Sequence, residues 1–404
     1  MHGETALLST LSVSLVFAFV GGLLAVRLKL PPLVGYLVAG IAVGPFTPGF
    51  VADPNLAPQL AEIGVILLMF GVGMHFSIAD LMAVRGVAIP GAVAQIAVAT
   101  ALGAGLVHFW GWPLSNGLVF GLSLSVASTV VLLRALEARG QVETPDGRIA
   151  VGWLVVEDLA MVIALVLLPA LAGGEASGAH APATGPLGLA FAITIGKLVL
   201  FVALMLVGGV RVFPWLLKRV ERTGSRELFT LAAIAVALGV AFGAARLFGV
   251  SFALGAFFAG VVINESELSR RAASDTQPLQ DAFAALFFVA VGMLFDPSVV
   301  VREPLRLLGV VAIIVVGKSL AAFAIVLALR RPLSTALAVS AALAQIGEFS
   351  FILAGLAVEL GLLPAEGQSL ILAGALLSIT LNPLAFAAAD RLAVRGRALR
   401  PATS

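Results

Sequence analysis

The sequence lacks several residue types on which common protein chemistry depends. It contains no cysteine, which excludes disulfide bonds, thiolate metal sites and thiol catalysis. Only four of its 404 residues are histidine, so a histidine-based metal centre is not expected. Charged residues make up 11% of the chain and apolar residues 60%, which is far outside the soluble range. A formal net charge of +2 gives no reason to expect nucleic acid as a partner.

The signatures of enzymes are missing as well. The sequence shows no Gly-rich phosphate loop, no metal-ligand cluster and no nucleophile accompanied by a histidine base. We therefore expect neither an enzyme nor a bound cofactor.

Long apolar runs dominate the chain instead. Lipid offers no hydrogen bonds to the backbone, so membrane spans must be helices or a closed barrel. The runs are continuous rather than alternating, which favours helices over a barrel. At about 15 to 25 residues per span, we predict an all-α polytopic membrane protein with thirteen spans. The predicted spans are 7–28, 33–45, 57–76, 87–109, 116–136, 149–171, 187–216, 228–245, 250–263, 279–295, 305–329, 334–360 and 368–390.

The basic residues indicate the orientation of these spans, because short cytoplasmic loops collect Lys and Arg. With the N-terminus outside, 19 of the 24 Lys and Arg follow odd-numbered spans and three lie on the opposite side. The 19 are Arg27, Lys29, Arg85, Arg134, Arg139, Arg148, Arg211, Lys218, Arg219, Arg222, Arg226, Arg270, Arg271, Arg330, Arg331, Arg391, Arg395, Arg397 and Arg400. We therefore predict a periplasmic N-terminus and a cytoplasmic C-terminus.

Five ionisable residues lie near the middle of predicted spans. Each costs about 2.5 to 3.5 kcal/mol at the centre of a membrane helix, so each requires an explanation. They are Glu157 and Asp158 in the sixth span, Lys197 in the seventh, Lys318 in the eleventh and Glu348 in the twelfth. For Lys197 and Glu348 a structural role is as reasonable as a functional one.

The adjacent acids are the central feature of this set. Neighbouring residues on a helix project about 100° apart, so Glu157 and Asp158 can serve two different partners. Lys318 is the natural cation for one of them, and the other can face a transport pathway. Two adjacent carboxylates repel each other in a low dielectric, which favours binding of a proton or a metal cation. Competition between the two would give exchange. The alternative is a neutralised packing triad without a transport role.

Two polar, small-residue interruptions break the apolar segments. One is the run Gly121–Val130, with four Ser and Thr residues, and the other is Ala344–Ser350. Corresponding interruptions in two halves of a transporter indicate its binding site, because unwound backbone there can bind an ion. The fifth and twelfth spans run in opposite directions, as an inverted repeat requires. The alternative for the hydroxyls is bonding within their own helix.

Several segments, in order along nearly the whole chain, resemble one known family. They are Pro32–Pro45 (PLVGYLVAGIAVGP), Ser128–Leu133 (STVVLL), Val155–Asp158 (VVED), Phe287–Asp296 (FFVAVGMLFD) and Ala344–Phe349 (AQIGEF). These motifs are similar to those of Kef-type members of the monovalent cation:proton antiporter-2 family, and within it to the YbaL-type potassium/proton antiporters.

The resemblance implies a fold and an assembly. It implies thirteen helices with inverted repeats, two crossed discontinuous helices and, usually, a homodimer in the bacterial inner membrane. The transmembrane domain would cover 1–395. Its ion-transporting core would comprise spans about 87–171 and 305–390, and the other spans would form the dimerisation scaffold. Residues 396–404 would be a cytoplasmic tail.

The resemblance also implies roles for particular residues. Asp158 would bind the transported cation and the proton, and Glu157 would pair with Lys318. Ser128 and Thr129 would line the ion site. Gln345 and Glu348 belong to the second broken helix. The loop Asn264–Pro278 resembles the cytoplasmic regulatory loop of Kef systems, with Asn264, Glu265 and Asp275 as its candidate residues.

The sequence departs from the family at two points. Kef proteins have a Gln-Asp pair where this chain has Glu157 and Asp158, which is closer to the paired acids of sodium/proton antiporters. Family members also usually continue into a cytoplasmic nucleotide-binding regulatory domain, which is not present up to Ser404. The predicted function is exchange of a monovalent cation, K⁺, for H⁺ by alternating access at Asp158. A Na⁺/H⁺ antiporter is the near alternative, and a gated cation channel is the alternative from another class.

Overall fold

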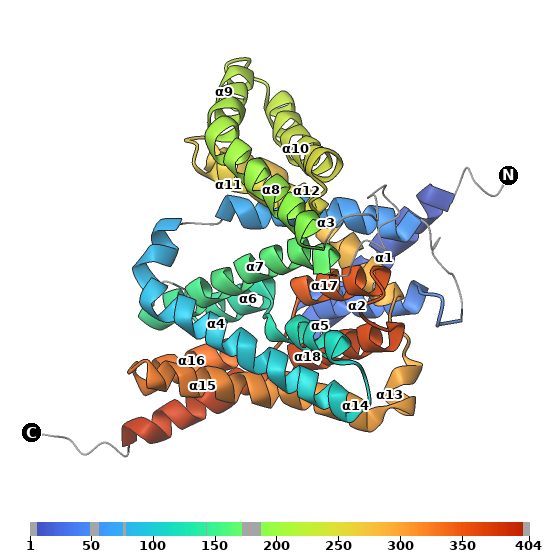
Figure 1. The fold of residues 1–404 in the computed structure, drawn as a ribbon, viewed down its shortest axis with the longest axis vertical. Coiled ribbons are helices and arrows are strands. Elements are labelled where there is room, and N and C mark those ends of the chain that lie inside the picture. Colours follow the sequence, from blue (N-terminus) through green and yellow to red (C-terminus); the bar gives the residue numbers. More distant parts are fainter. Residues whose placement is uncertain (1–5, 49–55, 76–77, 143, 172–186, 399–404) are drawn as a thin grey trace, which may run out of the picture. The chain divides into compact units, whose positions relative to one another are not determined.

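The computed structural model describes residues 6–48, 56–75, 78–142, 144–171 and 187–398. These residues form helices joined by turns, and the described part of the chain contains no strand (Figure 1). Two compact units share the chain. Unit 1 comprises residues 1–28, 35–77 and 164–294, and unit 2 comprises 29–34, 78–163 and 295–404.

Unit 1 contains all or most of the first three predicted spans and of the seventh to tenth. Its helices are α1 (Ala6–Arg27), most of α2 (Pro32–Val43), α3 (Leu56–His75), α8 (Leu187–Leu204), α9 (Val210–Glu221), α10 (Arg226–Gly243), α11 (Phe252–Asn264) and α12 (Ser269–Met293). Two π-helical turns, η1 (Met205–Gly209) and η2 (Ala244–Phe248), follow α8 and α10.

Small residues hold unit 1 together. A side-chain carbon at Gly73 of α3 would lie 2.1 Å from the carbonyl oxygen of Phe257 on α11. One at Gly260 of α11 would lie 2.2 Å from the carbonyl oxygen of Phe70. Helix backbones therefore touch directly at these glycines, as membrane helices do where small residues meet.

Unit 2 contains the two interrupted segments. Its helices are α4 (Ile78–Phe109), α5 (Leu114–Ser125), α6 (Thr129–Glu137), most of α7 (Pro145–Leu171), α13 (Ser298–Arg302), α14 (Pro304–Ala312), α15 (Lys318–Ala328), α16 (Leu333–Ala342), α17 (Glu348–Glu359) and α18 (Ala365–Ala398). The π-helical turn η3 (Ile313–Gly317) joins α14 to α15. Buried side chains of α4, α6, α7, α15, α16 and α18, including Leu132, Trp153 and Phe386, form one core cluster.

Each of the thirteen predicted spans falls on a helix or on a pair of helices. Among the residues described, eight helices are long and apolar enough to cross a membrane, and four shorter helices are apolar. The chain is thus a multi-pass, all-helical membrane protein. The number of spans and their orientation stay predictions.

One predicted loop is wrong. The loop expected over 264–278 is a short turn at 265–268, and residues 269–278 already belong to α12. Five of these ten residues are Arg, Ala or Gln, which form helices readily, so the low hydropathy of the stretch reflects polar surroundings rather than irregular structure. The cytoplasmic tail over 396–404 stays a prediction, and its first three residues continue α18, which ends at Ala398. Residues 399–404 lie outside the described residues.

Candidate ion-binding site

The two predicted interruptions are breaks between helices, and they cross each other inside unit 2. Residues 126–128 separate α5 from α6, and residues 343–347 separate α16 from α17. A side-chain carbon at Gly347 would lie 2.3 Å from the Cβ atom of Ser128. Only glycine therefore fits where the two breaks meet. The prediction of two crossed discontinuous helices is confirmed.

The side chain of Gln345, in the second break, forms hydrogen bonds with the backbone of Ser128 in the first. Its side-chain Oε1 accepts a hydrogen bond from the backbone N–H of Ser128 at 2.9 Å, and its Nε2 donates to the carbonyl oxygen of Ser128 at 3.2 Å. The same Nε2 lies 3.3 Å from the carbonyl oxygen of Ala342. Unwound backbone in a membrane needs such partners, because no water is available to it.

The adjacent acids have different partners, as their positions on α7 predicted. Glu157 Oε2 accepts a hydrogen bond from the backbone N–H of Ala127 at 2.9 Å. Asp158 Oδ2 accepts one from the hydroxyl of Thr129 at 3.0 Å. Glu157 is fully buried and Asp158 is 4% exposed. The two carboxylates thus bind successive parts of the first break.

Lys318 is also fully buried, but it does not bind the acid that we predicted. Its Nζ donates to the backbone carbonyl oxygen of Gln345 at 3.0 Å, and no direct ion pair joins it to Glu157. Lys318 and Glu157 therefore make no direct polar contact, although their charges remain close enough to attract each other. The reason lies in the helix ends. The exposed N–H of one break attracts the acid, and the exposed carbonyl of the other attracts the base.

Glu348 is the first residue of α17 and is 1% exposed. Its Oε2 accepts a hydrogen bond from the hydroxyl of Ser128 at 2.9 Å. All seven residues that we expected in or beside the ion site therefore lie together at the crossing. They are Ser128, Thr129, Glu157, Asp158, Lys318, Gln345 and Glu348.

Two buried amides at the crossing were missed by the sequence analysis. Gln95 of α4 donates from Nε2 to the carbonyl oxygen of Ser125, at the end of α5, at 3.0 Å. Asn382 of α18 donates from Nδ2 to the carbonyl oxygen of Ala341, near the end of α16, at 2.9 Å. Both satisfy carbonyls that a helix end leaves without a partner. A search for neutral amides in apolar spans would have found them.

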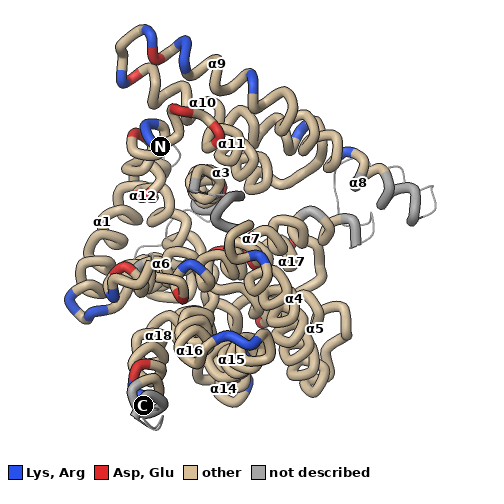
Figure 2. The backbone as a smooth tube through the Cα atoms, turned by 90° about the vertical axis from the view of Figure 1, so that its left-hand side faces the viewer, with Lys and Arg blue, Asp and Glu red and all other residues tan. Residues whose placement is uncertain are grey.

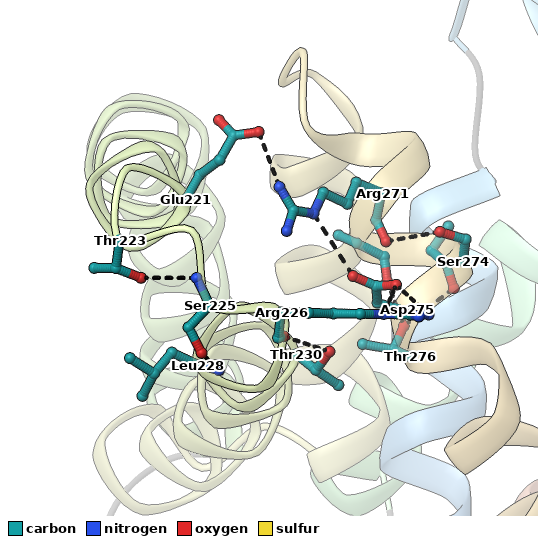
Figure 3. Close-up of polar contacts among 12 residues, drawn as sticks. Glu221, Thr223, Ser225, Arg226, Leu228, Thr230, Arg271, Ser274, Asp275 and Thr276 are labelled. Carbon is teal, nitrogen blue, oxygen red and sulfur yellow. Dashed lines mark hydrogen bonds and ion pairs between the residues drawn. The ribbon is translucent and has the colours of Figure 1, made fainter.

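The remaining candidates lie in unit 1. Asn264 ends α11 and Glu265 follows it, while Asp275 lies in α12. The Asp275 carboxylate forms ion pairs with Arg226 at 2.9 Å and with Arg271 at 3.7 Å (Figure 3).

Basic residues also gather on α9 and the turn that follows it (Figure 2). In this region Lys218 forms an ion pair with Glu267 at 2.9 Å, in the turn between α11 and α12. The hydrogen bond and the positive charge of Lys218 hold the pKa of Glu267 below its usual value. Lys197 of α8 is exposed and belongs to neither group.

A buried carboxylate at the crossing of two broken helices can serve as an ion-binding group. The second oxygen of Asp158, Oδ1, is buried and has no hydrogen-bond partner. It can accept a proton or bind a cation that has lost its water. Together with the fold, this arrangement defines an ion-coupled membrane transporter.

Comparison with known proteins places the chain in a family. Residues 15–389 match the transmembrane region of the sodium/hydrogen exchangers, and the chain belongs to this family of cation/proton antiporters. Its members are transporters rather than enzymes. The family expected from the sequence motifs is thereby confirmed.

Particular relatives cover the chain to different extents. Over 403 residues, the chain is 60% identical to the Escherichia coli (strain K12) protein YbaL, which is named as a cation/proton antiporter; the match covers 100% of this chain and 72% of that one. It is 35% identical over 387 residues to K(+) efflux antiporter 4 of Arabidopsis thaliana, covering 95% of this chain and 64% of the relative. The sodium proton antiporter MjNhaP1 of Methanocaldococcus jannaschii shares the fold, with a TM-score of 0.68 at 17% identity over 97% of this chain and 99% of that one.

Proposed function

We propose that the protein exchanges K⁺ for H⁺ by alternating access, with the cation and the proton competing for Asp158. The observation that carries the proposal is the Asp158 carboxylate, which is buried, held by Thr129 through one oxygen and unpartnered at the other. A proton and a cation cannot both occupy that oxygen. Binding of one therefore releases the other, and this competition couples their movements.

The other residues of the site prepare this carboxylate. Thr129 fixes the orientation of Asp158, and Ser128 holds Glu348 beside the first break. Glu157 and Lys318 stabilise the two unwound segments, because each binds the helix end of opposite polarity. Because Glu157 and Lys318 are engaged by the two breaks, we assign the transported ions to Asp158.

K⁺ as the substrate is supported by the relatives. One is named as a K(+) efflux antiporter, and the motifs resemble those of Kef-type potassium antiporters. Na⁺ is the second candidate, favoured by the paired acids Glu157 and Asp158 and by the fold shared with a sodium proton antiporter.

The assembly and orientation belong to the same proposal. We place the transport core in the spans over 87–171 and 305–390, and a dimerisation scaffold in the rest, within a homodimer of the bacterial inner membrane. The distribution of Lys and Arg supports a periplasmic N-terminus. A regulatory role for Asn264, Glu265 and Asp275, through a cytoplasmic domain or a nucleotide, rests on the Kef resemblance.

The test is proton flux in liposomes that contain the purified protein and a pH-sensitive dye. Addition of K⁺ should dissipate a preset pH gradient, and Asp158→Asn should abolish the effect. Asp281→Asn, which removes an exposed carboxylate of α12, is the matched control and should exchange at the normal rate. Exchange at the normal rate by Asp158→Asn would show the assignment to be wrong.

The same liposomes separate the alternatives. Na⁺ in place of K⁺ tests the choice of cation. A gated channel would pass the cation without coupled proton movement, so cation flux at clamped pH would continue unchanged.

A further inference from the structure

A second carboxylate lies at the same point of the first break as Asp158. Ser128 and Thr129 are neighbours in the chain, and each donates its hydroxyl to a different acid. Ser128 binds Glu348 at 2.9 Å and Thr129 binds Asp158 at 3.0 Å. The two carboxylates are therefore held by consecutive residues, and their charges interact directly with each other.

Each of these carboxylates uses one oxygen and leaves the other without a partner. Glu348 Oε1 and Asp158 Oδ1 are buried and accept no hydrogen bond. The hydroxyl of Ser350, in the first turn of α17, is buried and unpartnered too. Glu157 Oε1 at the same crossing is likewise buried and without a hydrogen-bond partner. Buried polar atoms are normally satisfied, so these four atoms around one crossing indicate a ligand.

The charges of the crossing do not balance without such a ligand. Its ionisable groups are Glu157, Asp158, Glu348 and Lys318, and they are the fully or nearly fully buried charges among the residues that the structure describes. Lys318 and Glu157 are one positive and one negative charge that attract each other. No positively charged side chain of the crossing is then left for the two remaining carboxylates, and the N-terminus of α17 offers Glu348 only a partial charge. Both cannot stay ionised side by side in a low dielectric unless a cation lies between them.

We propose that Glu348 is a second cation- and proton-binding carboxylate, so that one monovalent cation is exchanged for two protons. In the cation-bound state both carboxylates are deprotonated and share the cation. In the proton-bound state each carries one proton. One positive charge leaves and two enter, so each cycle moves one net charge. The proposal rests on the proposed function, in which the proton and the cation compete for Asp158.

Proton release on cation binding tests this count without requiring turnover. Purified protein in detergent and weak buffer is titrated with KCl, with choline chloride as the ionic-strength control, across a range of pH. At the pH of maximal release we expect about two protons per bound K⁺ for the unmodified protein and about one for Glu348→Gln. Glu348→Asp keeps the carboxylate and should restore the second proton.

Glu359→Gln is the matched control, because it makes the same change at the exposed end of the same helix. It should release as many protons as the unmodified protein. If the unmodified protein and Glu348→Gln both release about one proton, the second site is refuted and the proposed function stands. If K⁺ binds to the unmodified protein without releasing any proton, the proposed function itself fails.

Glu348→Gln could also stop binding K⁺ while remaining folded by size-exclusion chromatography. That result supports Glu348 as a cation ligand, and the proton count then comes from acid–base titration without K⁺. Above about pH 6, where exposed carboxyls such as Glu359 are already ionised, Glu348→Gln should take up about one proton fewer than Glu359→Gln. Equal uptake would overturn the proposal.

Discussion

The two units place their charges in opposite ways. Unit 2 buries Glu157, Asp158, Lys318 and Glu348 completely or nearly so, at a crossing of broken helices. The ion pairs of unit 1 lie near helix ends, where Arg226 is 78% exposed and Glu267 83% exposed. A buried charge costs several kcal/mol unless it is compensated, whereas an exposed pair contributes little. Unit 1 holds one largely buried carboxylate, Asp275, which is 7% exposed and paired with two arginines, whereas unit 2 gathers four buried charges at the predicted ion site.

The largest effect is expected when one basic residue is removed from each unit and the two losses of stability are compared. Lys318→Ala leaves a helix-end carbonyl without its donor and leaves the buried acids without their positive charge. We expect it to lower the free energy of unfolding by about 3 to 5 kcal/mol, as for a broken buried pair. Arg226→Ala removes an exposed partner and should cost less than about 1 kcal/mol. Unfolding midpoints in detergent measure both, and equal shifts would remove the distinction between the units.

A smaller effect is expected where the two breaks touch. Gly347→Ala brings a methyl group to 2.3 Å from Ser128 Cβ, so the breaks must move apart. We expect a loss of about 1 to 3 kcal/mol from overpacking, together with loss of exchange in liposomes. Gly355→Ala, in α17, is the control, because its nearest neighbour is 3.8 Å away at the flexible amide of Gln368. Normal exchange by Gly347→Ala would mean that close contact at the crossing is dispensable.

The smallest effect concerns Glu267, whose pKa the exposed Lys218 partner lowers. A carboxyl with a lowered folded pKa adds stability above its unfolded pKa and loses it as the pH falls through the folded value. Glu267→Gln should therefore leave the melting temperature nearly unchanged at neutral pH, and any small difference should vanish in acid or in high salt. Glu265→Gln, in the same turn, is the control. A large difference that persists in acid would contradict this account.

Much of the fold could be predicted from the sequence, because backbone groups in lipid must find their hydrogen-bond partners within the protein. Continuous apolar runs predicted helices, and small polar residues within two of them predicted the breaks at 126–128 and 343–347. The start of α12 was missed, because a polar helix outside the apolar runs and a loop look alike in hydropathy. The number of spans stays open for a related reason: short helices such as α2 and α11 do not reveal by length whether they cross the membrane.

The sequence predicted the charged residues of the site, but not the contacts that depend on where the helix ends lie in space. Asp158 and Lys318 stand out in apolar segments because a charge there is costly. Gln95 and Asn382 are neutral, and their use is visible only once the carbonyls that they bind are known. The hydrogen bond from Lys318 to the Gln345 carbonyl was not predicted, because a sequence displays side-chain charges but not the partial charges of helix ends.

The double hydrogen bond between Gln345 and Ser128 has a mechanical consequence. Sliding one break past the other would rupture both bonds together and strand buried backbone groups, at about 1 to 3 kcal/mol for each. Motion of the crossing as one rigid piece ruptures neither. An ion bound at Asp158 would then cross the membrane together with all of its ligands, and no ligand would be exchanged during the transition.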